Sequence, residues 1–202
     1  VTEDADLGIR LFKRGYRTRI VDSTTYEEAN SKSENWLRQR SRWLKGYMVT
    51  WIVHMRHPIR LIQEIGIKNF MSFQFIVGGT FFSALLNPIY WTFTILWLVL
   101  QPNFIQKLFP PFVFYMGVIC LYVATFVFTY VNVAGAMRRG YYDMVWAAIL
   151  SPIYWAMSSI ASWKGFIQLI FKPHFWEKTH HGLYQNNHGE NELKDRNQDE
   201  SK

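Results

Sequence analysis

The stretch NFMSFQFIVGGTFFSALLNPIYWTFTILWLVLQPNFIQ, residues 69–106, contains no charged side chain. Two further stretches share this property, residues 108–137 and residues 144–163. A helix needs about 20 apolar residues to cross the hydrocarbon core of a bilayer, and a soluble helix of similar length would show a polar face. The sequence therefore predicts an integral membrane protein that is mainly α-helical.

The charged residues gather on both sides of this apolar region. The chain has 202 residues, half of them hydrophobic, and carries a formal net charge of +7. Residues 1–68 hold most of the charge, and residues 187–202 are almost wholly polar, which predicts a disordered tail. Because Lys and Arg concentrate beside anionic lipid on the cytoplasmic face, the basic excess indicates membrane lipid as a partner and no nucleic acid.

The basic residues also predict which side of the membrane each loop occupies. Arg138 and Arg139 separate the second and third apolar stretches. The positive-inside rule places them in the cytoplasm, on the same side as residues 1–68. Residues 101–111 are then expected on the opposite side, between two crossings.

Three membrane segments are expected. The first, residues 70–100, is one tilted or kinked span broken near Pro88, and the second covers residues 112–135. Residues 144–171 either cross the bilayer or form a re-entrant pair of helices, because Pro152 splits the apolar run. The re-entrant interpretation is favoured, since a crossing would carry the basic residues that follow to the outer side.

The chain begins with VTEDADLGIRLFKRGYRTRIVD, which predicts a helix followed by a short strand. Thr2 is suited to cap the helix, and the acids after it are suited to its first turn. Gly15 fits the position just past the helix end. An apolar buried face is expected from Leu7, Leu11 and Phe12. The alternation in residues 16–22 predicts a strand.

A long helix is expected to begin with Ser33 as its cap and to end before the His57-Pro58 pair, which breaks it. Apolar and charged residues then alternate with helical spacing in IRLIQEIGIKNF, which starts at Ile59. This pattern, directly before an apolar stretch, favours an amphipathic helix lying on the membrane surface. A surface helix of a globular protein is the alternative.

Two groups of residues are able to carry chemistry. Glu3, Asp4 and Asp6 crowd the start of the chain, and carboxylates held close together raise one another's pKa, which turns one of them into a general base. Helix capping is the simpler explanation for acids at such a position.

The second group is QRSRW, residues 39–43. Gln39, Arg42 and Trp43 share one helix face. Arg binds phosphate in a bidentate manner, and an indole offers an apolar surface for a sugar ring, so this face suits a sugar nucleotide. The alternative is a basic helix at the membrane surface, anchored by its Trp.

Together, VTEDADLGIRL, QRSRW and the spans that follow resemble the C-terminal half of a membrane-embedded family 2 glycosyltransferase. The superfamily includes cellulose synthase and poly-N-acetylglucosamine synthase, and the late FKPHFWEKTHHG resembles the ending of a bacterial subgroup. The resemblance implies that Asp4 is the base that deprotonates the acceptor hydroxyl, and that Glu3 and Thr2 shape its surroundings.

The same resemblance implies roles for the second group. Gln39 and Arg42 would hold the diphosphate of the donor, and Arg40 would assist them. Trp43 would stack under the acceptor sugar where a polymer enters the membrane. By a looser analogy, residues 175–179 would act as a gating loop.

The resemblance also implies the domain organisation. Residues 1–56 would be the C-terminal part of a GT-A catalytic domain, which is an α/β fold, and residues 57–68 the interface helix. Residues 69–171 would form the transmembrane region. Residues 172–202 would be a cytoplasmic juxtamembrane segment and tail.

The nucleotide-binding half of such enzymes, with its Asp-x-Asp metal motif, has no counterpart in this sequence, so we expect the chain to be an inactive piece of a longer enzyme. A divalent cation, Mg or Mn, is implied for the whole enzyme, with ligands outside this chain. The implied partners are a nucleotide-sugar donor, an oligo- or polysaccharide acceptor and export-complex subunits, at the bacterial inner membrane.

The function that the resemblance implies is inverting transfer of a sugar to a growing β-linked polysaccharide. Two alternatives stay open. One is a non-processive glycosyltransferase that acts on a lipid or small acceptor. The other is a transport or scaffold protein without chemistry, although ion transport would require polar groups in mid-membrane, and the spans offer few.

Overall fold

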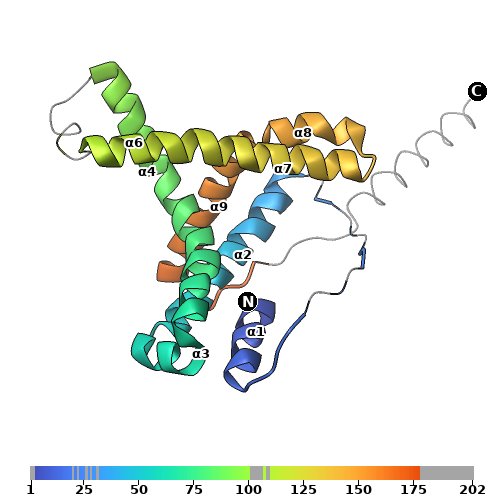
Figure 1. The fold of residues 1–202 in the computed structure, drawn as a ribbon, viewed down its shortest axis with the longest axis vertical. Helices are drawn as coiled ribbons and strands as arrows, with labels where there is room; N and C mark the ends of the chain where they lie inside the picture. Colours follow the sequence, from blue (N-terminus) through green and yellow to red (C-terminus); the bar gives the residue numbers. More distant parts are fainter. Residues whose placement is uncertain are drawn as a thin grey trace, which may run out of the picture. The chain divides into compact units, whose positions relative to one another are not determined.

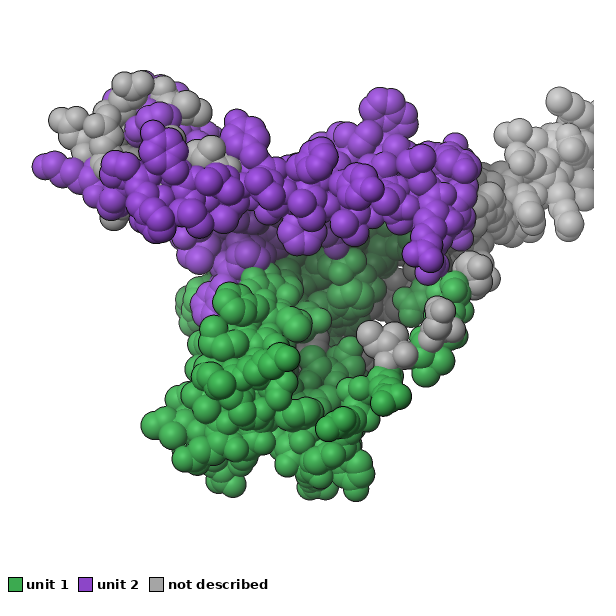
Figure 2. Space-filling view, viewed as in Figure 1, with its two compact units in different colours: residues 1–81, 161–202 green, residues 82–160 purple. Residues whose placement is uncertain are grey.

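A computed structural model of the chain describes residues 3–19, 21, 23–25, 27, 29–30, 32–100, 107 and 110–177. In this part of the chain the regular elements are all helical, and the longer ones are labelled in Figure 1. The chain divides into two compact units, which Figure 2 colours separately. Unit 1 comprises residues 1–81 and 161–202, and unit 2 comprises residues 82–160.

The first helix, α1 (Glu3–Lys13), confirms the helix expected after the opening acids. Gly15 lies just past the end of the helix, as predicted, and its φ of 82° is in the left-handed region that glycine tolerates. The Gly15 N–H donates to Phe12 O, and the Tyr16 N–H donates to Leu11 O, which satisfies the last carbonyls of the helix.

The expected buried face of α1 is wrong. No residue of α1 is buried, and Leu7 and Phe12 are 55% and 41% exposed. Only Ile9 packs against the core of unit 1. The apolar spacing was correctly assigned to a helix, but the described residues supply no second surface to cover it.

The strand expected at residues 16–22 is also wrong for the residues of this segment that the structure describes, 16–19 and 21. A strand is stable only when a neighbour completes its ladder of hydrogen bonds. The described part of the chain contains no second strand.

The long second helix, α2 (Ser33–His54), lies where the sequence predicts it. Ser33 is its first residue rather than its cap, because the preceding Lys32 takes the extended cap conformation, without a side-chain cap hydrogen bond. The helix ends before the His57-Pro58 pair, and α3 (Pro58–Phe73) begins at the proline, as expected.

One glycine divides α3. The backbone of Gly66 leaves the helical region, with φ 76° and ψ 157°. Gly66 therefore interrupts the predicted surface helix, residues 57–68, and residues 58–65 form its uninterrupted part. After Gly66, the chain continues through a π-helical turn, η1 (Gln74–Gly78), into α4 (Gly79–Leu100).

The core of unit 1 forms where this part of the chain packs against α2. Leu61, Ile65, Phe73 and Val77 are buried together. Tyr47, Trp51 and Met55 of α2 and Ile9 of α1 pack against them. The Trp51 indole N–H also donates to Gln74 Oε1 at 2.8 Å, so a hydrogen bond joins α2 to η1 at the edge of this core.

Within the part of the chain that the structure describes, two helical stretches are long and apolar enough to cross a membrane, Pro58–Trp97 and Pro111–Arg138. The first includes α3 and most of α4, and α4 runs through Pro88 without interruption, so the break expected there is wrong. The hydroxyl of Thr92, four residues later, donates to the Pro88 carbonyl at 2.8 Å, a bond within the same helix.

The second stretch comprises α6 (Pro111–Ile119), η2 (Cys120–Ala124) and α7 (Thr125–Arg138), in unit 2. None of the side chains described in this stretch is buried by other parts of the protein. A third segment joins η3 (Tyr142–Met144) and α8 (Val145–Ile149) to α9 (Ser151–Phe171), bent by 59° at the junction. This bend suits a broken span or a re-entrant loop, the two alternatives expected for residues 144–171.

Candidate active site

The side chains of the QRSRW segment lie in the middle of α2. Helical geometry brings Gln39, Arg42 and Trp43 to one face, as their spacing predicts. The Gln39 side-chain oxygen accepts a hydrogen bond from Asn30 Nδ2 at 2.7 Å, and Asn30 Oδ1 accepts one from Asn35 Nδ2 at 2.6 Å. These bonds hold the Gln39 amide in one orientation.

Both guanidinium groups of this segment stack on indole rings. The Arg40 guanidinium carbon lies 4.5 Å from the centre of the Trp43 ring, and that of Arg42 lies 5.1 Å from the centre of the Trp176 ring. Stacking uses the face of a guanidinium and leaves its N–H donors, which lie in its plane, able to bind phosphate. Trp43 itself remains 39% exposed.

Residues 172–177, here called the C-terminal segment, lie against α2 within unit 1. The Lys45 Nζ donates to the carbonyls of Lys172 and Phe175, at 2.9 and 3.0 Å. Lys45 is buried, and burial lowers the pKa of its ammonium group. Two main-chain acceptors thus partly replace the water that this charge loses.

Glu177 provides a second attachment of the C-terminal segment. Its carboxylate accepts hydrogen bonds from Lys164 at 3.0 Å and Gln168 at 3.1 Å, and lies 3.7 Å from Arg38 of α2. Burial acts to raise the Glu177 pKa, but these hydrogen bonds and positive charges outweigh it and lower the pKa overall. The remaining residues of the suggested gating loop, 178 and 179, lie outside the described residues.

The opening acids are less enclosed. Glu3 and Asp4 occupy the first turn of α1 and are exposed, and Thr2 lies outside the described residues. α1 is joined to α2 through Asp6 and His54, three turns beyond Trp43, which is roughly 16 Å along the helix axis at 1.5 Å per residue. The structure thus places both groups of predicted residues in unit 1 without showing a direct contact between them.

The contact at Asp6 is close, and its His54 partner is enclosed. His54 Nε2 lies 2.7 Å from Asp6 Oδ1, and the other carboxylate oxygen accepts from Arg10 Nε at 2.8 Å. Burial acts to raise the Asp6 pKa, but the hydrogen bonds from Arg10 and His54 lower it overall. The carboxylate is therefore ionised at neutral pH.

Sequence reasoning missed three of these residues as contributors: Lys45, His54 and Trp176 as the partner of Arg42. Lys45 lies between Leu44 and Gly46 on a helix whose apolar and polar residues are not separated into two faces, so the sequence does not indicate that it is buried. A histidine in the last turn of a helix has an ordinary explanation in the helix dipole. Their partners are distant in sequence, so spacing could not reveal them.

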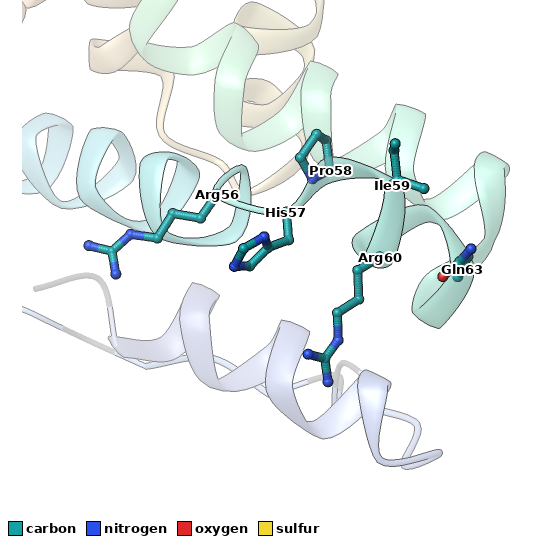
Figure 3. A pocket seen from close by; sticks show the side chains of 6 residues that line it. All are labelled: Arg56, His57, Pro58, Ile59, Arg60 and Gln63. Carbon is teal, nitrogen blue, oxygen red and sulfur yellow. The ribbon is translucent and has the colours of Figure 1, made fainter.

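A surface groove opens at the corner between α2 and α3. Its lining comprises Arg56, His57, Pro58, Ile59, Arg60 and Gln63. Figure 3 shows the Arg60 side chain extending toward α1, whereas Arg56 extends alongside α2. None of the predicted site residues lines this groove.

Among the residues that the structure describes, no group of three or more His, Cys, Asp or Glu side chains is arranged to hold a metal ion. The described residues therefore do not fit a site for the divalent cation that the family resemblance implies. What they offer instead is hydrogen-bond donors, cations and exposed indole surface.

The sequence model of one family, described as Glycosyl transferase family group 2, matches residues 1–160. That match includes α1, α2, the first two predicted spans and part of the third segment, and leaves out the second half of α9 and the C-terminal segment. No curated protein and no solved structure matches the chain.

Proposed function

The chain belongs to the glycosyl transferase family group 2, and from this membership we propose that the intact protein is an inverting enzyme that extends a β-linked polysaccharide. The donor is a nucleotide sugar, and the reaction takes place at the cytoplasmic face of a bacterial inner membrane. The family match is the observation that carries the proposal. It favours an enzyme over a transporter or a scaffold.

In this proposal the reaction is a single displacement at the anomeric carbon of the donor. The Asp4 carboxylate takes the proton of the acceptor hydroxyl as its oxygen attacks that carbon. The bond to the nucleoside diphosphate breaks, and the diphosphate leaves with the electron pair. Glu3 and Thr2 shape the surroundings of Asp4.

The α2 residues stabilise the departing diphosphate. Negative charge grows on it as the bond breaks, and a positioned guanidinium lowers the energy of that state. Arg42 is suited to this role because stacking on Trp176 limits its rotation. The Gln39 amide, oriented by Asn30, supports the same group, with help from Arg40.

Trp43 provides the platform for the acceptor sugar. Its indole is partly exposed, and Arg40 stacks against the ring. An aromatic face packs well against the C–H groups of a sugar ring. In this proposal the divalent cation and the remainder of the nucleotide-sugar site are held by parts of the enzyme outside the described residues.

The proposal is tested by Asp4→Asn in the intact protein, with Glu27→Gln as a control that removes another exposed carboxylate. Loss of a general base lowers rates by about 10²- to 10⁴-fold. The rate of sugar transfer should therefore fall by at least about 10²-fold, while the donor Kd changes little. The measurements are release of nucleoside diphosphate from a panel of nucleotide sugars, and donor binding by calorimetry. Wild-type turnover in Asp4→Asn would show that Asp4 is not the base.

A further inference from the structure

The pair formed by Asp6 and His54 has no role in the chemistry proposed above. It joins the acidic turn of α1 to α2, and the His54 side chain is only 5% exposed. The His54 ring also packs edge-to-face on Phe73, with ring centres 5.9 Å apart. Phe73 belongs to the buried core cluster at the end of α3.

The rest of α1 is weakly anchored. It contains no buried residue, and among its apolar side chains Ile9 is the one that packs against the core. At the opposite end of the helix, Lys13 Nζ lies 3.1 Å from Glu64 Oε2, but both side chains are about a quarter or more exposed. An exposed ion pair contributes little, roughly 0–1 kcal/mol. Asp6 therefore contributes an enclosed polar contact to the positioning of the first turn.

A catalytic Asp–His dyad is the obvious alternative, and the geometry argues against it. The enclosed His54 side chain faces Asp6 and Phe73, so its ring does not reach a substrate hydroxyl. Both Asp6 oxygens are engaged, one by His54 and one by Arg10. The geometry therefore suits a pair that fixes α1 against α2, and does not suit a pair that transfers a proton.

We propose that Asp6 and His54 are positioning residues that set where the carboxylate of Asp4 stands relative to α2. Asp4 lies two residues before Asp6 in the same helix, so a shift of Asp6 moves Asp4 with it. This inference rests on the proposed function, in which Asp4 is the base. A displacement of about 1 Å is enough to slow a reaction by about 10²-fold.

The test uses three variants of the intact protein. His54→Leu removes the donor, His54→Gln keeps an N–H near the position of Nε2, and Asp6→Asn removes the charge from the other side. We expect His54→Leu to lower kcat by about 10- to 100-fold, with the donor KM changed less than about twofold. Hydrogen exchange of the α1 amides should speed up in His54→Leu and return most of the way in His54→Gln.

The effects of the two single substitutions on kcat should not be additive. If the pair acts as one unit, the double variant Asp6→Asn/His54→Leu is no slower than the slower single variant. Wild-type kcat per folded enzyme in both His54→Leu and Asp6→Asn would overturn the positioning role. So would a loss in His54→Leu that is additive with Asp6→Asn and not rescued by Gln.

The Asp4→Asn variant, assayed in the same experiment, distinguishes the role of Asp4 as the base from the positioning role of Asp6 and His54. Full activity in Asp4→Asn overturns the assignment of the base and, with it, the positioning role. Loss of activity in Asp4→Asn together with normal turnover in His54→Leu overturns the positioning role alone.

Discussion

Lys45 shows how one buried charge organises the candidate site. Its ammonium group donates to two carbonyls of the C-terminal segment, which places Trp176 against Arg42. The interaction spans 127 residues of sequence at its closer partner. The guanidinium that we assign to the donor diphosphate is thus held by a segment that follows α9.

Lys45→Met should release the C-terminal segment from α2. Methionine keeps the length of the side chain but donates no hydrogen bond, and each lost bond to a charged donor removes about 1.5–3 kcal/mol. Amide exchange in residues 172–177 should therefore speed up by about tenfold or more, as measured by mass spectrometry. Lys68→Met, at an exposed lysine of α3, is the matched control. Unchanged exchange in Lys45→Met would show that other contacts hold the segment.

For individual residues, the sequence predicted correctly which side chains lie together when they belong to the same helix. Gln39, Arg42 and Trp43 share a face because their spacing matches the helical period. It could not find Trp176 beside Arg42, because that contact depends on how α9 packs against α2. The assigned roles of Asp4 and of the α2 residues remain predictions.

Helix packing in unit 1 depends on one small residue of α9. A Cβ placed on Gly165 would lie 2.7 Å from the Ser41 carbonyl oxygen and 3.3 Å from the Lys45 backbone nitrogen. No side chain fits there without moving the backbone of one helix. Gly165 therefore allows α9 to approach the same turns of α2 that carry the candidate site.

Gly165→Ala should push α9 away from α2. Overpacking of this kind costs about 1–3 kcal/mol, so the detergent-solubilised intact protein should melt at a lower temperature. Gly135→Ala in α7 is the control, since a Cβ there would meet nothing within 4 Å. Equal melting temperatures for wild type and Gly165→Ala would contradict the close packing of α2 and α9.

The helices themselves were largely predictable, because their signals are local. The proline at the start of α3 and Gly15 after α1 mark element boundaries in the sequence as they do in the structure. The short strand failed because strands depend on partners elsewhere. The interruption assigned to Pro88 also failed, since the helix accepts that proline and the backbone departs from helical geometry at Gly66 instead.

For the whole molecule, the membrane character follows from composition and is supported by the structure. Two stretches have the length and apolar content of a span, and the bent pair formed by residues 142–149 and 151–171 is a possible third. The bend of 59° between these helices is compatible with a broken span and with a re-entrant loop, the two paths that the sequence left open. The assignment of the loops to the two sides of the membrane remains a prediction from charge.

In the enzyme as a whole, we propose that the acids of α1 and the QRSRW face of α2 act on the same sugar. The most direct measurement is an electron cryomicroscopy structure of the intact protein with a nucleotide and an oligosaccharide acceptor bound. We predict a sugar ring packed on Trp43, with its reacting hydroxyl within about 3 Å of the Asp4 carboxylate. An acceptor bound elsewhere, with Asp4 and Trp43 facing separate solvent, would contradict the account.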